Sequence, residues 1–279
     1  MNFTKMHGTG NDFILVNCMN EDISKTNWPE ISTRLCDRHF GIGADGLILV
    51  LPSNKYDLQM RIFNADGSEA EMCGNGIRCF TLFAKEQKLI NKNTTTIETL
   101  AGKIVPEIIT SDGDSATIKI NMGQPQFNPD ELTQTINILY PSNNGNQTIV
   151  DRQYTVTPVN MGNPHAVIFV GNTHDFPVTD IGPIIEADSF FPNKTNVEFI
   201  EIISENEIKM RVWERGSGET LACGTGACAS VVAGILHNKL ADKVTVNLLG
   251  GKLEIDWPNH EEVYLTGSAK IVFNGQITI

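Results

Sequence analysis

Along most of this chain, apolar residues either alternate with polar ones or form short β-branched runs between Gly, Asn and Pro. Both patterns are typical of β-strands. After each of two Cys-Gly-x-Gly segments the apolar spacing changes to three or four residues, which is typical of an amphipathic helix. The pattern therefore predicts an α+β protein. The predicted strands are residues 13–16, 47–51, 58–63, 95–100, 166–170, 197–203, 208–213 and 244–248.

The second half of the chain repeats the first. Residues 59–80 align without gaps with residues 209–230, which places Cys73 on Cys223 at an offset of 150 residues. Six of these 22 positions are identical, including the cysteine and both glycines of each Cys-Gly-x-Gly segment. A fixed offset over several segments indicates a duplicated structural unit.

The duplication predicts two pseudo-symmetric halves, each a mixed or antiparallel sheet wrapped around one central helix. We expect the N-terminal half to span residues 1–122, completed by a C-terminal strand at 268–279. The C-terminal half is then 123–267, and we expect the active site in the cleft between the halves.

Charge and hydropathy limit the classes of partner. The chain has 279 residues, with 33 acidic and 21 basic side chains and a net charge of −12. An acidic surface disfavours nucleic acid, whose phosphates require clustered Lys and Arg. No apolar run approaches the length of a membrane span, and the first residues do not read as a secretory signal. We therefore expect a soluble cytoplasmic protein without a membrane partner.

Residues 41–46 match the dinucleotide fingerprint Gly-x-Gly-x-x-Gly. That motif binds a pyrophosphate only when a strand precedes it and a helix follows. Here a helical stretch at 31–38 comes first and the predicted strand at 47–51 comes afterwards. The match therefore does not indicate a nicotinamide cofactor.

Cys73 and Cys223 each lie where a loop is predicted to become a helix. The unpaired N–H groups and dipole at a helix N-terminus lower the pKa of a thiol from about 8.5 toward neutrality and can bind a carboxylate. A single cysteine of this kind could be no more than a buried apolar residue. Two equivalent copies favour a function.

Two thiols on opposite sides of one carbon could invert a stereocentre without a cofactor. One thiolate would remove a proton from one face while the other thiol donates a proton to the opposite face. A different reading is a metal or redox module built from four cysteines. No Cys-x-x-Cys pair supports a zinc site, although four sulfurs are available in Cys73, Cys79, Cys223 and Cys228.

Five segments together resemble the diaminopimelate epimerase family. They are residues 6–13 (MHGTGNDF), 63–68 (FNADGS), 73–79 (CGNGIRC), 161–165 (MGNPH) and 214–226 (ERGSGETLACGTG). The combination is specific, and the resemblance runs from residue 6 to the end of the chain. The Cys-Gly-x-Gly segment alone also occurs in the related proline racemases.

The resemblance implies an isomerase that interconverts LL- and meso-diaminopimelate, independent of pyridoxal phosphate and of metals, in lysine and peptidoglycan biosynthesis. It implies a homodimer, and it makes Cys73 and Cys223 the catalytic acid/base pair. Residues implied to bind substrate are Asn11, Asn64, Gly74, Asn75, Asn163, Asn196, Glu214, Arg215, Gly224 and Thr225. His165 and Glu214 match residues that hold or tune the thiols.

Diaminopimelate has two identical amino-acid ends, of which one is inverted. The distal end must be bound by fixed groups, and Arg215 suits its carboxylate. The alternative is a proline or hydroxyproline racemase-like enzyme, which would use the same pair of thiols. Its substrate has no second amino-acid end, so it would need no residues to bind one. Many family members carry a Gln where this chain has Gly46, so the contact from that side chain is absent here.

Overall fold

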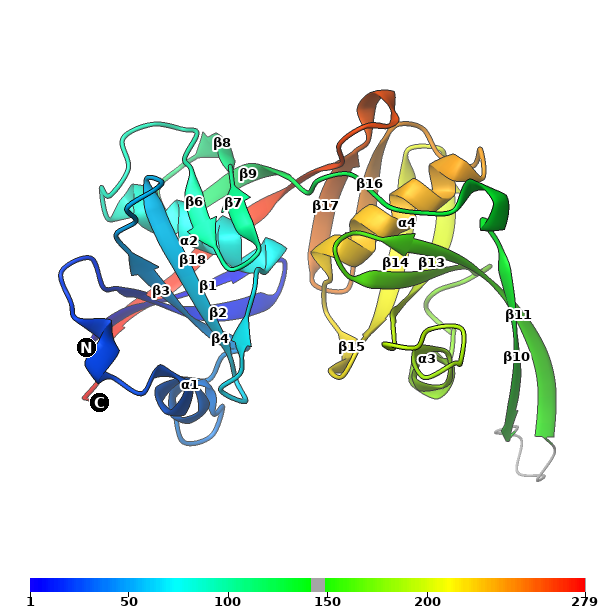
Figure 1. Cartoon of the computed structure of the whole chain (residues 1–279), viewed down its shortest axis with the longest axis horizontal. Coiled ribbons are helices and arrows are strands. Elements are labelled where there is room, and N and C mark those ends of the chain that lie inside the picture. Colours follow the sequence, from blue (N-terminus) through cyan, green and yellow to red (C-terminus); the bar gives the residue numbers. More distant parts are fainter. Residues whose placement is uncertain (142–148, 279) are drawn as a thin grey trace. The chain divides into compact units, whose positions relative to one another are not determined.

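The computed structural model describes residues 1–141 and 149–278, which form two compact units. The N-terminal unit comprises Met1–Asn121 with Thr266–Ile279, and the C-terminal unit comprises Met122–Leu265 (Figure 1). The last strand therefore returns the chain to the unit in which it began. In the part of the chain that is described, no helix is long and apolar enough to cross a membrane.

Strands dominate the N-terminal unit, together with two α-helices. The strands are β1 (Asn2–Gly8), β2 (Asn11–Asn17), β3 (Gly46–Leu51), β4 (Leu58–Asn64), β5 (Glu69–Ala70), β6 (Ile97–Thr99), β7 (Gly102–Ile104), β8 (Glu107–Ser111), β9 (Ser115–Asn121) and most of β18 (Tyr264–Gln276). The helices are α1 (Trp28–Cys36) and α2 (Gly74–Glu86). β1 pairs antiparallel with both β2 and β18, which ties the end of the chain into this unit.

The C-terminal unit has the same character. Its strands are β10 (Gln134–Pro141), β11 (Ile149–Asn160), β12 (Pro164–Phe169), β13 (Asn196–Ser204), β14 (Glu207–Glu214), β15 (Gly218–Thr220), β16 (Lys243–Leu248) and β17 (Gly251–Asp256). Its α-helices are α3 (Val178–Glu186) and α4 (Gly224–Leu236). The predicted α+β fold class is confirmed.

The two units share one strand-pairing pattern. β2–β3 and β4–β6 are parallel, while β3–β4, β4–β5 and β6–β7 are antiparallel. In the C-terminal unit β12–β13 and β14–β16 are parallel, while β13–β14, β14–β15 and β16–β17 are antiparallel. The register also repeats, because Phe13 is opposite Gly46 and His165 is opposite Asn196. Equivalent positions of the two units can therefore be compared residue by residue.

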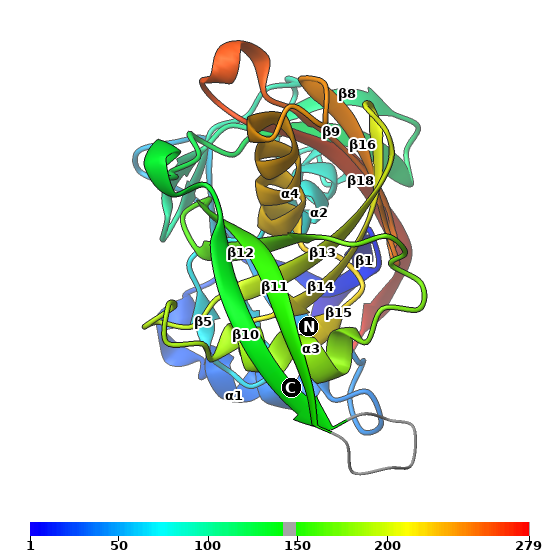
Figure 2. The ribbon, with the colours of Figure 1, turned by 90° about the vertical axis from the view of Figure 1, so that its right-hand side faces the viewer.

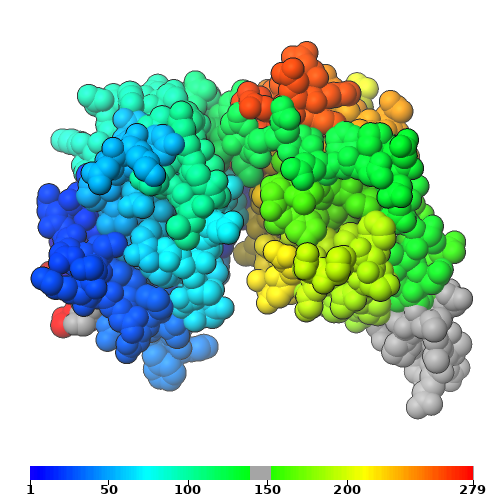
Figure 3. Space-filling model, in the orientation of Figure 1, coloured from blue at the N-terminus to red at the C-terminus, as the bar shows by residue number. Residues whose placement is uncertain are grey.

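The central helices α2 and α4 are both 13 residues long and begin directly after Cys73 and Cys223. α2 packs on β1, β2 and β9. α4 packs on β11, β12, β13 and β17 (Figure 2). All but two of the residues of α4 are buried, which explains why it is apolar on every side. In the space-filling view, residues that precede α4 in the sequence form most of the visible face of its unit (Figure 3).

A second helix in the C-terminal unit was not predicted. α3 has the same nine-residue length as α1 and lies at the same 150-residue offset, but it contains Gly182 and Pro183. These two residues are poor helix formers, so the local sequence indicates a break. Packing requires the glycine, because a Cβ at position 182 would lie 2.6 Å from the side chain of Trp213.

Residues 41–45 lie between α1 and β3, and Gly46 is the first residue of β3, in the order predicted from the sequence. The order helix, glycine loop, strand is the reverse of a dinucleotide-binding turn. The fingerprint match is therefore coincidental.

Candidate active site

In the N-terminal unit, Cys73 caps the first turn of α2. Its sulfur accepts a hydrogen bond from the backbone N–H of Gly76 at 3.4 Å and donates to Asn11 Oδ1 at 3.7 Å. Asn75 Nδ2 donates to the same Asn11 oxygen at 3.2 Å. Three residues named from the sequence thus form one cluster at a helix N-terminus, and Gly74 is the first residue of that helix.

Two charged residues that sequence reasoning did not select hold this cluster in place. Asp45 Oδ2 accepts a hydrogen bond from Asn11 Nδ2 at 2.6 Å. This contact orients the Asn11 amide so that its oxygen faces the Cys73 thiol. The fully buried Arg78 donates to Asn75 Oδ1 at 3.0 Å and, from its Nε, to the Ser268 carbonyl at 3.1 Å. Arg78 lies within the Cys73–Cys79 motif, and its position one helical turn after the cap could have indicated it.

Gly46 and Asn64 lie opposite one another on β3 and β4. A Cβ at position 46 would lie 2.8 Å from the carbonyl oxygen of Phe63, so the backbone here leaves no room for a side chain. Asn64 is exposed and donates a hydrogen bond to Ser68 Oγ at 2.9 Å. This hydrogen bond is separate from those that link Cys73, Asn11 and Asn75.

In the C-terminal unit, Cys223 caps α4 in the same way. Its sulfur accepts from the backbone N–H of Gly226 at 3.4 Å and lies 3.5 Å from Thr225 Oγ1. Asn163 Nδ2 donates to that hydroxyl oxygen at 3.4 Å. Asn163, Thr225 and Cys223 therefore form the counterpart of the Asn11 cluster, with Gly224 as the first helical residue.

Carboxylates surround Cys223. Burial raises the pKa of this thiol well above its usual value, and the charges of Glu214 and Glu198 raise it further. Burial also raises the pKa of Glu214. The hydrogen bond that its carboxyl group accepts from the Thr220 hydroxyl lowers this pKa, but by less. The expectation that a helix N-terminus lowers the pKa of Cys223 is therefore wrong, because desolvation outweighs the effect of the helix cap.

His165 and Glu198 form a buried pair beneath this cluster. His165 Nδ1 lies 2.7 Å from Glu198 Oε1, and His165 Nε2 lies 3.0 Å from Asn163 Oδ1. Both side chains of the pair have 0% exposure. His165 was selected from the sequence, whereas Glu198 was not.

Asn196 and Arg215 are neighbours. Asn196 Oδ1 accepts from the backbone N–H of Arg215 at 3.0 Å, and its Nδ2 donates to the Pro164 carbonyl at 3.0 Å. The Arg215 guanidinium donates to the Asn193 carbonyl at 3.1 Å. Asn196 therefore positions the backbone of the turn that carries Arg215.

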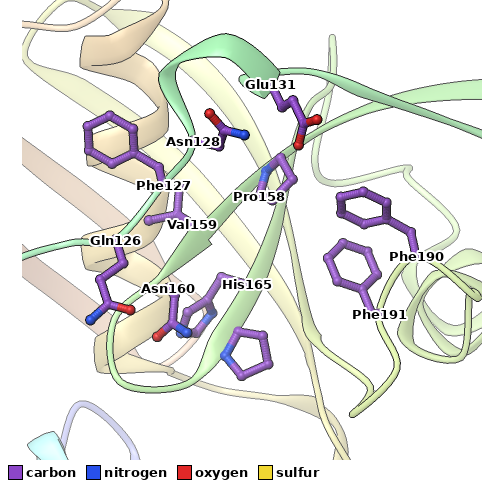
Figure 4. Close-up of a pocket in the computed structure, with 11 residues that line it drawn as sticks. Gln126, Phe127, Asn128, Glu131, Pro158, Val159, Asn160, His165, Phe190 and Phe191 are labelled. Carbon is purple, nitrogen blue, oxygen red and sulfur yellow. The ribbon is translucent and has the colours of Figure 1, made fainter.

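A cavity of about 220 Å³ opens in the C-terminal unit (Figure 4). Phe127, Pro158, Phe190 and Phe191 give it apolar walls, and His165 contributes to its lining. Cys223 does not line it. This cavity was not predicted from the sequence.

The other motif cysteines lie inside the central helices. Cys79 in α2 and Cys228 in α4 have no exposed surface, and burial raises the pKa of Cys79 to about 12. Within residues 1–141 and 149–278, no three His, Cys, Asp or Glu side chains are grouped closely enough to hold a metal ion.

The fold resembles that of several solved structures. A PhzF-family phenazine biosynthesis protein from Bacillus anthracis matches with a TM-score of 0.69 and 20% identity, over 100% of this chain and 99% of that chain. A probable proline racemase from Agrobacterium radiobacter matches with a TM-score of 0.67 and 14% identity, over 100% and 93%. These likenesses show that the chain shares the fold of these two proteins.

Sequence comparison gives the family. A family model described as diaminopimelate epimerase matches residues 3–128 and 157–272. A diaminopimelate epimerase of Halothermothrix orenii is 53% identical over 100% of this chain and 98% of its own length. One from Methanococcus maripaludis is 50% identical over 100% of both. The chain belongs to the diaminopimelate epimerase family.

Alkylation should distinguish the two capping thiols. We expect iodoacetamide at neutral pH to modify Cys73 before Cys223, because Cys73 is half-buried while Cys223 is 6% exposed and has a raised pKa. Only the thiolate reacts, so labelling of Cys223 should rise as the pH increases. Peptide mass spectrometry along a pH series measures both rates. Equal labelling at neutral pH would contradict this electrostatic description.

Proposed function

We propose that this chain interconverts LL- and meso-diaminopimelate without a cofactor, with Cys73 and Cys223 as the two acid/base groups. The main support is the presence of two equivalent half-sites, each with a thiol at the N-cap of a buried helix, in a chain whose full-length relatives carry that enzyme name. One thiol alone could exchange a proton on a single face. Two allow inversion.

In the proposed step, the thiolate of one cysteine takes the α-proton, so an S–H bond forms as the C–H bond breaks. The electron pair left on the α-carbon takes a proton from the other thiol on the opposite face. The enzyme then holds the reverse protonation state and runs the reaction backward equally well. Backbone N–H groups at a helix N-terminus can stabilise charge on the substrate carboxylate as the proton leaves.

The remaining predicted residues divide between binding and support. We assign Asn11, Asn75 and Thr225 to the reacting end, because each lies within one or two hydrogen bonds of a capping thiol. Arg215, with Asn64, Asn163 and Asn196, is assigned to the distal carboxylate, and Glu214 to an ammonium group. Gly74 and Gly224 let the substrate approach the helix ends closely.

Assay of purified protein with LL-diaminopimelate tests the function. We expect formation of meso-diaminopimelate up to an equilibrium reached from either substrate, with no added cofactor or metal. L-Proline and trans-4-hydroxy-L-proline serve as the matched alternatives and should not be inverted. Inversion of proline without inversion of diaminopimelate would contradict the proposal, as would activity that chelator removes.

We also propose a cytoplasmic homodimer. All six cysteines are unbridged, and the mechanism needs two of them as free thiols, which a reducing compartment maintains. The family resemblance supports the dimer. Light scattering coupled to size-exclusion chromatography gives the mass directly, and a monomer at assay concentrations would contradict this.

A further inference from the structure

The two units carry different residues at equivalent buried positions beside their central helices. The shared register makes Phe13 equivalent to His165 and Ile48 equivalent to Glu198. The helices give the same match: a Cβ on Gly76 would lie 3.1 Å from Ile48, and a Cβ on Gly226 would lie 2.5 Å from Glu198. One unit thus has an apolar pair where the other has a histidine and a carboxyl group.

The fold itself does not require the polar pair. Phe13 and Ile48 are 3% and 0% exposed, so the same framework is well packed with two hydrocarbon side chains. A buried ion pair is a poor source of stability, since desolvation offsets its attraction. The cost is visible at Glu198, whose Oε2 is buried and makes no hydrogen bond to any described residue. Stability therefore does not account for the polar pair, which points to a role in the site.

Hydrogen-bond directions connect this pair to the thiol. The Asn163 amide nitrogen donates to Thr225, so its oxygen faces His165 Nε2 and must accept. Glu198 Oε1 lies within hydrogen-bond distance of the other ring nitrogen, Nδ1. An oxygen atom therefore faces each ring nitrogen of His165, so both nitrogens have an acceptor to which an N–H can donate. The Thr225 oxygen accepts from Asn163, which leaves its hydrogen for the Cys223 sulfur.

We propose that Glu198 is a positioning residue that keeps both ring nitrogens of His165 protonated. His165 then donates to the Asn163 oxygen, Asn163 donates to Thr225, and the Thr225 hydroxyl donates to the Cys223 sulfur. Besides Glu198, the carboxyl group of Glu214 lies near enough to His165 for their charges to interact. The donated hydrogen bond stabilises the Cys223 thiolate formed during turnover. This inference rests on the proposed epimerase function.

Glu198→Gln tests the direction of donation. A neutral amide no longer stabilises the imidazolium, so Asn163 can turn, donate to His165 and accept the Thr225 hydrogen. We expect kcat to fall about 10- to 100-fold, the loss of one charge-assisted hydrogen bond, with KM little changed. The surface variant Glu254→Gln, which removes a charge from the exposed Lys243 pair, should keep wild-type kcat.

Nitrogen-15 NMR measures the protonation of the two His165 ring nitrogens in the absence of substrate. The variant His165→Phe identifies the His165 signals, because they are missing from its spectrum. We expect two protonated ring nitrogens at neutral pH in the wild type and one in Glu198→Gln. Because this readout needs no turnover, it separates failure of this inference from failure of the proposed function. A singly protonated His165 in the wild type would overturn the proposal, as would an unchanged kcat in Glu198→Gln.

The double variant His165→Phe/Glu198→Ile installs the pair found in the N-terminal unit. We expect it to fold with a melting temperature at or above that of the wild type, since hydrophobic replacement of a buried pair is often neutral or stabilising. Its kcat should fall at least as far as that of Glu198→Gln. A double variant that fails to fold, or that melts earlier while keeping kcat, would show a structural pair and overturn the proposal.

Discussion

Replacing either Cys73 or Cys223 with alanine is expected to lower kcat for diaminopimelate inversion by about 10²- to 10⁴-fold, the usual contribution of a positioned acid or base. Each variant loses the group that accepts the proton on its face of the α-carbon in one direction and donates a proton to that same face in the reverse direction. Both directions should therefore fail together, as measured by conversion of LL- and meso-diaminopimelate. A variant that retained one direction would contradict a shared two-thiol step.

Cys79→Ala and Cys228→Ala are the matched controls, because each removes a buried thiol from the same helix as a capping thiol. They should keep a kcat close to wild type, with only the small loss of stability that a deleted buried sulfur causes. A four-cysteine metal or redox module predicts the opposite, since all four sulfurs would be needed. Equal loss in all four variants would favour that module.

Gly226→Ala is expected to lower the free energy of unfolding by about 1–3 kcal/mol, the usual range for overpacking a core. The added methyl group would lie 2.5 Å from Glu198 Oε1 and 3.1 Å from its Cγ, and the carboxyl is pinned by His165. The unfolding midpoint should fall by several degrees, at roughly 2–4 °C per kcal/mol for a unit of this size. Activity should fall as well, because the Glu198 side chain must move.

Gly76→Ala provides the comparison at the equivalent position. Its methyl group would meet only the terminal carbons of Ile48 and Ile62, at 3.1 and 3.3 Å, which can shift. Alanine is also favoured over glycine in a helix by up to about 1 kcal/mol, so the two effects oppose each other. Differential scanning calorimetry should therefore show a much smaller change than for Gly226→Ala. Equal changes would contradict the contrast between the two cores.

The strands and central helices were predictable because their hydrophobic periodicity is local and occurs twice. α3 was not, because Gly182 is there to admit Trp213, a contact that forms only in the folded unit. The capping cysteines and their asparagine and threonine neighbours were also predictable, since short motifs carry them. Within each unit, hydrogen bonds link these residues, as from Cys73 to Asn11 and from Asn163 to Thr225.

Glu198 and the raised pKa of Cys223 were not predictable for a different reason. In the run 196–204, a glutamate between Val197 and Phe199 reads as the solvent side of a strand. Those two residues do pack into a core cluster, but α4 covers the opposite face of β13 and buries Glu198. Burial from both sides of a sheet is a tertiary property, and it sets the electrostatics of the thiol.

Deuterium incorporation at early conversion tests the two-thiol mechanism most directly. Wild-type protein is incubated with LL-diaminopimelate in D₂O, and substrate and product are analysed before appreciable reversal. We expect meso product with one solvent deuterium at the inverted α-carbon and recovered LL substrate with almost none, because separate groups remove and deliver the proton. Product that keeps the substrate's own hydrogen, or equal labelling of both from the start, would contradict it.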